Sequence, residues 1–157
     1  MSSAYRIEDE PLPGRLSHLV VDPFWPLLAV MLGGAWLSWP WFVFNGVAVG
    51  SPTRRREVAW AVGGFAGSLA LAAGLLLLAN AEVLAATGVR YALIVPTVWK
   101  LLVTYALYTL QGRSFHLFEH YGGRVRSGLV VVAAGYLLGA RLLASLPGAP
   151  FWILVVR

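Results

Sequence analysis

The stretch Tyr91-Ala-Leu-Ile-Val-Pro-Thr-Val-Trp-Lys100-Leu-Leu-Val-Thr-Tyr-Ala-Leu-Tyr-Thr-Leu110 decides the fold, because it is a long apolar run with one charged side chain at its centre. Twenty helical residues extend about 30 Å, which is the thickness of the hydrocarbon core of a bilayer. In a spanning helix, Lys100 therefore lies about 15 Å from either membrane surface. A charge at that depth costs about 2.5–3.5 kcal/mol on insertion scales, so we expect the fold to supply a partner for it.

The composition of the whole chain favours a membrane protein. Of its 157 residues, 59% are hydrophobic and 12% are charged, and the mean hydropathy is +0.72. Soluble domains carry about 25% charged residues. The length suits one domain, and the lack of cysteine in the sequence excludes disulfides and thiolate metal sites. The net charge of +5 comes from arginines beside apolar runs, which favours membrane lipids over nucleic acid as partners.

Four apolar segments lie between a polar acidic tail, residues 1–23, and a short apolar C-terminal tail, residues 147–157. The tail at 147–157 is too short to span, so we expect it in the interface or packed on the bundle. The sequence predicts an all-α, multi-pass integral membrane helical bundle. Its membrane segments are expected at about 24–44, 52–79, 91–110 and 127–146, with the last three spanning.

The segment 24–44 leaves two arrangements open. It lies between two groups of tryptophans, and such aromatic belts suit a spanning helix that ends at Pro40. The Gly33-Gly34 pair instead suits a re-entrant hairpin, whose irregular backbone is tolerated where protein buries it. The segment 52–79 has a clearer start, because Ser51 suits an N-cap with Pro52 at the first helical position.

Arginine is concentrated in two loops. The loop between the second and third segments has a single arginine opposed by Glu82. The positive-inside rule therefore predicts that loops 51–57 and 111–126 are cytoplasmic in a multi-pass protein of the cell (inner) membrane. The same arginines are candidates for contacts with lipid headgroups. They are Arg54, Arg55, Arg56, Arg113, Arg124 and Arg126.

A polar stripe runs along the third segment at spacings of three and four residues, which places its members on one helix face. This pattern makes the stripe a candidate ion or ligand pathway, with Lys100 selecting an anion. The alternative is a buried lysine held by hydroxyls and backbone carbonyls. A counter-charge is expected from a loop glutamate (Glu57, Glu82 or Glu119), another subunit or a lipid phosphate. The stripe consists of Thr97, Lys100, Thr104, Tyr108 and Gln111.

Small residues line one face of the second segment and one face of the fourth, and each face includes a G-x-x-x-G spacing. Such faces let helix backbones approach closely. They serve equally well for an oligomer interface or for packing within the chain. The helix-packing candidates are Gly63, Gly67, Gly74, Gly135 and Gly139.

His116, Glu119 and His120 match the H-x-x-E-H signature of a zinc peptidase. Catalytic zinc takes three protein ligands, and no residue after Tyr121 is acidic. We therefore interpret the motif as a polar surface helix, and we expect neither a metal nor another cofactor.

The sequence predicts a small non-enzymatic integral membrane protein that assembles as a homo-oligomer or as a subunit of a larger membrane complex. The alternative is a channel or transporter with an anion or ion pathway along the Lys100 stripe. A membrane metallohydrolase built on the H-x-x-E-H loop is the remote alternative.

Overall fold

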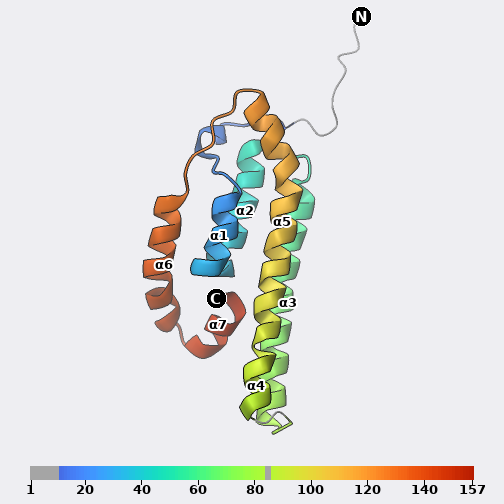
Figure 1. The fold of residues 1–157 in the computed structure, drawn as a ribbon, viewed down its shortest axis with the longest axis vertical. Helices are drawn as coiled ribbons and strands as arrows, with labels where there is room; N and C mark the ends of the chain where they lie inside the picture. Colours follow the sequence, from blue (N-terminus) through green and yellow to red (C-terminus); the bar gives the residue numbers. More distant parts are fainter. Residues whose placement is uncertain (1–10, 84–85) are drawn as a thin grey trace, which may run out of the picture.

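The computed structural model describes residues 11–83 and 86–157, apart from the side chains of Ala86 and Ala140. Most of the acidic part of the predicted N-terminal tail, residues 1–10, lies outside the described residues. The described chain is all-helical, as predicted, and contains no strand within those ranges (Figure 1). Its helices are η1 (Ser17–Leu19), α1 (Phe24–Leu32), α2 (Ala35–Val49), α3 (Arg54–Asn80), α4 (Ala86–Ala92), α5 (Ile94–His120), α6 (Leu129–Ala144) and α7 (Ala149–Val156).

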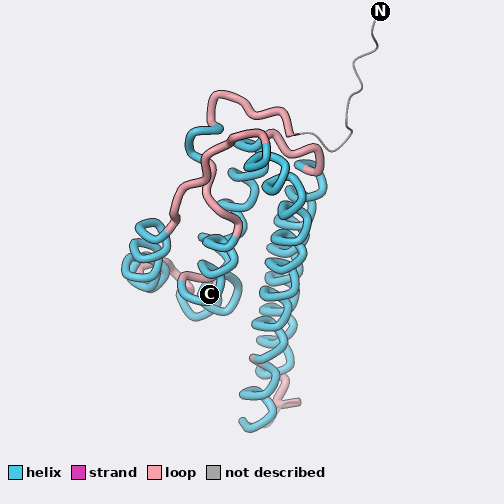
Figure 2. Tube along the Cα trace, turned by 45° about the horizontal axis from the view of Figure 1, so that its top comes forward, coloured by secondary structure: helices cyan, strands magenta, loops and turns pink. Residues whose placement is uncertain are grey.

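The two longest helices, α3 and α5, lie side by side and form the long axis of the molecule (Figures 1 and 2). Each has 27 residues, which corresponds to about 40 Å of helix. Within the described residues, Arg54–Asn80 and Thr87–His120 are long and apolar enough to cross a membrane. Of the three helices predicted to span, those at 52–79 and 91–110 therefore have the length and apolar composition that spanning needs.

The segment 24–44 is not one helix. It breaks at Gly33-Gly34, where Gly34 has φ +103°, a conformation that favours glycine. Helix α2 then runs back beside α1 (Figure 1), and a hydrogen bond of 2.7 Å from Asn45 Nδ2 to the Val21 carbonyl joins the outer ends of the pair. The segment therefore forms a helical hairpin. Pro40 lies inside α2 and does not end it, although an interior proline removes a helical hydrogen bond and crowds the preceding turn.

Helices α6 and α7 form the C-terminal part of the fold. The predicted span at 127–146 is a helix of 16 residues, about 24 Å long and shorter than a hydrocarbon core. The predicted tail at 147–157 forms α7, which folds back so that its end lies beside the second turn of α5 (Figure 1). There the backbone of Val156 lies so close to Gly34 that a side chain at residue 34 would collide with it.

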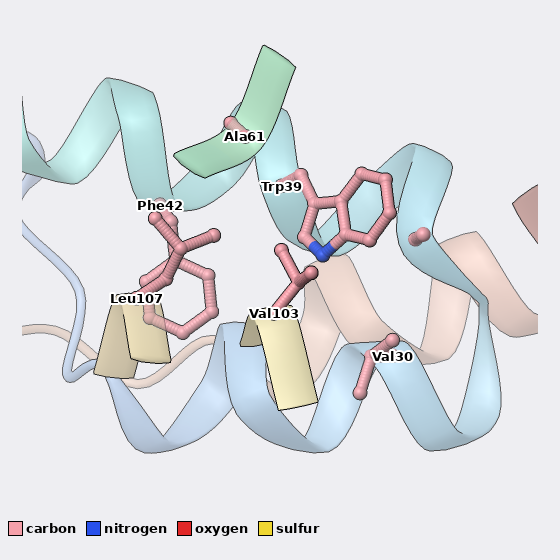
Figure 3. Packing of buried hydrophobic residues seen from close by; sticks show 7 residues of the cluster. Val30, Trp39, Phe42, Ala61, Val103 and Leu107 are labelled. Atoms are coloured by element: carbon pink, nitrogen blue, oxygen red, sulfur yellow. The ribbon is translucent and has the colours of Figure 1, made fainter. Parts of the chain in front are cut away.

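The central core gathers side chains from four helices, as Figure 3 shows. Trp39 and Phe42 of α2 pack against Val103 and Leu107 of α5. A second cluster lies where α2 ends and α3 begins, and it includes Val49 of α2 and Phe118 of α5. We call this end of the bundle, which carries residues 50–57 and 121–128, the arginine-rich end.

Candidate functional site

Lys100 lies on α5 with only 5% of its surface exposed. Its Nζ donates a hydrogen bond of 3.0 Å to the carbonyl oxygen of Leu154, in the last turn of α7. The last four carbonyls of a helix have no partner within that helix, and they carry the negative end of its dipole. A cation beside them is favoured, so the fold places the end of α7 against Lys100.

The predicted polar stripe does not act as one unit. Thr104 is buried, and its hydroxyl donates to the Lys100 carbonyl at 2.7 Å while accepting from the Trp39 indole at 2.9 Å. Thr97 is exposed and donates to a carbonyl one turn earlier. Tyr108 is half-buried, and Gln111 is buried in a different cluster. The hydrogen bond recorded for the ammonium therefore goes to a backbone carbonyl rather than to a hydroxyl of the stripe.

A cavity of about 200 Å³ adjoins Lys100 between α1, α5 and the end of α7. Its polar lining comes from Lys100, Thr97 and Arg157, and no acidic side chain is among its lining residues. Arg157 was not predicted from the sequence, because only the fold, in which α7 turns back toward α5, brings this residue beside Lys100. Two cations thus share one cavity beside the first two turns of α5.

Glu57 forms a second buried polar cluster, at the arginine-rich end. It is fully buried, although the sequence suggested a loop position. Its Oε1 accepts hydrogen bonds from Ser51 Oγ at 2.6 Å and from Thr53 Oγ1 at 2.8 Å. Its Oε2 accepts a bond of 2.6 Å from Gln111 Nε2 of α5. The carboxyl group therefore joins α3 to α5 and to the turn before α3.

Gly46 of α2 completes the Glu57 cluster, because a Cβ at this position would collide with the Glu57 carboxyl group. Ser51 was predicted as an N-cap. Helix α3 instead begins at Arg54 after Thr53, without a side-chain cap bond, and the Ser51 hydroxyl serves Glu57. The spacing of four residues between Thr53 and Glu57 is the one sequence signal for this cluster, because such residues share a helix face.

The two buried ionisable groups lie apart. Gln111, which contacts Glu57, is eleven positions from Lys100 on α5, or about 16 Å along the helix. Glu57 was one of the three glutamates expected as a counter-charge for Lys100, and this distance shows that it does not have that role. The other two candidate sources, Glu82 and Glu119, are exposed.

The predicted glycine faces divide between contact and open space. A Cβ at Gly67 would meet the Trp99 ring of α5, and Cβ atoms at Gly135 and Gly139 would meet side chains of α2. Gly63 and Gly74 have nothing within 4 Å of the position of a Cβ. Three of these glycines therefore pack within the chain, and two face outward.

The remaining predicted residues lie on the surface. His116, Glu119 and His120 are exposed near the end of α5. In the part of the chain that the structure describes, no three histidine, aspartate or glutamate side chains are grouped to hold a metal ion. The candidate lipid-contacting arginines are also exposed, and two of them, Arg124 and Arg126, line a cavity.

The candidate site thus comprises a buried lysine near the start of α5 and a buried glutamate at the arginine-rich end, each hydrogen-bonded to a different part of the bundle. Such burial fixes the position of each group and ties together helices that lie far apart in sequence. No family model, curated protein or solved structure matches this chain.

Proposed function

We propose that this chain is a small non-enzymatic integral membrane protein that works as a subunit of an assembly, either with copies of itself or within a larger membrane complex. One observation carries the proposal: the exposed side chain of Arg157 shares a cavity with Lys100 near the middle of a helix long enough to span. A cation facing lipid at that depth is costly. A partner that covers the cavity removes that exposure.

The surface around this cavity supports the same proposal. Met31 of α1 is 70% exposed at the cavity rim, and Leu101 of α5 is 39% exposed. The short helices α1 and α7 both end here, and helix ends inside the hydrocarbon layer are tolerated where protein covers them. We therefore assign the face formed by α1, α5 and the end of α7 to the subunit interface.

The proposed topology follows from the arginines. The segments 51–57 and 111–126, which include the start of α3 and the end of α5, face the cytoplasm, and the α1–α2 hairpin enters and leaves the inner membrane from that side. Because the chain has no cysteine, single cysteines report this directly. Ser127→Cys should be protected from an impermeant thiol reagent in intact cells, and Val83→Cys should react. The opposite labelling pattern rejects the orientation.

The assembly is tested by native mass and by crosslinking in membranes. Met31→Cys should crosslink to a second copy or to a larger partner, because it lies at the rim of the proposed interface. Leu77→Cys is the matched control, since it is equally exposed, at 70%, on the distant part of α3. A monomeric native mass after gentle extraction, together with equal crosslinking of the two variants, refutes the proposal.

The second candidate function is an anion pathway, favoured by the two cations and the Thr97 hydroxyl in the cavity. In this alternative, the cavity holds the anion between the helix ends, where charged groups inside a bundle mark ion routes. Anion flux into liposomes separates the two candidates. Flux that is lost in Lys100→Met, with native mass unchanged, favours the pathway over the subunit.

A further inference from the structure

A separate cavity of about 440 Å³ lies at the arginine-rich end. Its lining comes from residues 13–18, which include the start of η1, and from the end of α5 with the loop that follows it. Both segments lie at the same end of the bundle (Figure 2). The Arg126 amide donates to the Val20 carbonyl at 2.8 Å, and the Asp22 amide donates to the Arg126 carbonyl at 3.3 Å. These backbone bonds join segments more than a hundred residues apart. The cavity is therefore part of the folded structure rather than a space beside a single loop.

The polar lining of this cavity is cationic. Arg124, Arg126 and His18 contribute basic side chains, Ser17 and Tyr121 contribute hydroxyls, and none of the lining residues is acidic. Residues 124 and 126 belong to a non-helical stretch, in which side chains two positions apart share a face when the chain is extended. The cavity volume falls within the range of small-ligand pockets. An anionic ligand is the chemistry that this lining suits.

The apolar floor of the cavity is tightly packed. A Cβ at Gly123 would collide with the Phe118 ring, and Gly122 before it has φ +83°. The two glycines let the chain turn directly over that ring as α5 ends. Val125, between the two arginines, packs against the cluster that contains Phe118. The turn is thereby held in place, and both arginines are carried on a packed base.

His18 adds a further polar group. Its Nδ1 lies 2.9 Å from the Arg15 carbonyl oxygen, and only a protonated nitrogen can donate to that acceptor. This bond fixes the tautomer and leaves Nε2 as the second polar atom of the ring. In the neutral ring with Nδ1 protonated, Nε2 can accept a hydrogen bond from the hydroxyl of a hydrogen phosphate.

The depth of the cavity is set by its backbone bonds. Val21 forms a bridge with Arg126, and its amide also donates to the Asn45 side chain. Asn45 is adjacent to Gly46, which contacts Glu57 in the first turn of α3. Arg126 therefore lies at the level where the apolar part of α3 begins. In a membrane, this is the headgroup level, where basic pockets bind phosphate-bearing lipids.

From this arrangement we infer that the cavity lined by His18, Arg124 and Arg126 binds a phosphate group. Guanidinium groups match phosphate oxygens by paired, charge-assisted hydrogen bonds. The phosphate belongs either to an anionic lipid headgroup or to a soluble phosphate compound. This inference is independent of the proposed subunit interface, which lies beside the first turns of α5, away from the arginine-rich end.

The experiment uses the full chain in nanodiscs and two probes. Equilibrium dialysis measures the binding of inorganic phosphate in phosphatidylcholine nanodiscs. Native mass spectrometry measures retention of phosphatidylglycerol from mixed nanodiscs. Arg124→Gln with Arg126→Gln should weaken the binding of at least one probe by about tenfold or more, since each arginine contributes a charge-assisted bond. The matched control, Arg54→Gln with Arg55→Gln, removes the same charge from exposed positions at the same end and should change binding less than about twofold.

Loss with phosphatidylglycerol alone identifies a lipid headgroup, and loss with phosphate alone identifies a soluble ligand. Either result supports the phosphate site. Equal loss in the pocket variant and the control shows a diffuse charge effect and overturns the site, as does the absence of binding for both probes. If the double variant changes the melting temperature, Arg124→Gln alone replaces it and should weaken binding several-fold.

Discussion

Glu57 and Lys100 are both buried ionisable residues on the two long helices, yet the fold satisfies them in different ways. Glu57 accepts hydrogen bonds from three side chains, namely those of Ser51, Thr53 and Gln111. Lys100 donates to one backbone carbonyl, that of Leu154. A side-chain donor is lost by a single substitution, whereas a carbonyl stays whatever residue carries it. The Glu57 cluster therefore depends on residue identity, and the Lys100 contact depends on where α7 docks.

The largest effect is expected from Glu57→Ala. This change removes the shared acceptor of three side-chain donors, of which Ser51 and Gln111 are buried. It also leaves a cavity, and each buried group that stays unsatisfied costs about 1–3 kcal/mol. The free energy of unfolding in detergent or lipid, followed by tryptophan fluorescence, should fall by about 3 kcal/mol or more. Glu119→Ala is the control, because Glu119 is exposed at the same end of the bundle, and it should change stability by about 0.5 kcal/mol at most. Equal effects of the two variants contradict the role given to the Glu57 cluster.

An intermediate effect is expected from Gly46→Ala. The added methyl collides with the Glu57 carboxyl group and must displace it from its donors, so stability should fall by about 2 kcal/mol, within the range for overpacked cores. The matched control is Gly63→Ala, whose Cβ meets nothing within 4 Å. It should leave stability unchanged or raise it slightly, because alanine favours helix over glycine. If the two alanines behave alike, α2 does not contact Glu57 as described.

The smallest global effect is expected from Lys100→Met. This change removes a charge-assisted hydrogen bond but also the cost of burying an ammonium group, so the free energy of unfolding should change by about 1 kcal/mol or less. The effect should be local: backbone amides of α7 should exchange with solvent deuterium faster than in the wild type. Thr97→Val, which alters the same cavity, should leave α7 exchange unchanged. A loss of several kcal/mol without faster exchange indicates a buried carboxylate partner instead.

The sequence allowed the helical class and the two long helices to be predicted. The predicted segment 52–79 corresponds closely to α3. The predicted segment 91–110 covers the end of α4 and the first part of α5, which continues to His120. The length of an apolar segment is enough to predict these two helices, because a helix forms the hydrogen bonds of its own backbone without needing a partner. The hairpin at Gly33-Gly34 was one of two open arrangements, since tryptophan belts and glycines point to different answers.

The partners of the buried charges could not be predicted from sequence. Glu57 follows three arginines, a pattern typical of a solvated helix start, and its burial becomes apparent only when α2 and α5 close over it. The Leu154 carbonyl carries no sequence signal, because every residue has one. Only the three-dimensional path of α7 shows which carbonyl meets Lys100.

The bond between Lys100 and Leu154 joins residues 54 positions apart, and this separation has a consequence for biogenesis. At translation rates of about 5–20 residues per second, Leu154 is made about 3–11 seconds after Lys100. During that interval the nascent helix carries an ammonium group whose acceptor does not yet exist. In the proposed membrane topology, synthesis of the final turn of α7 thus completes the solvation of a charge already inserted, and a chain released before Leu154 would leave that charge facing the hydrocarbon layer.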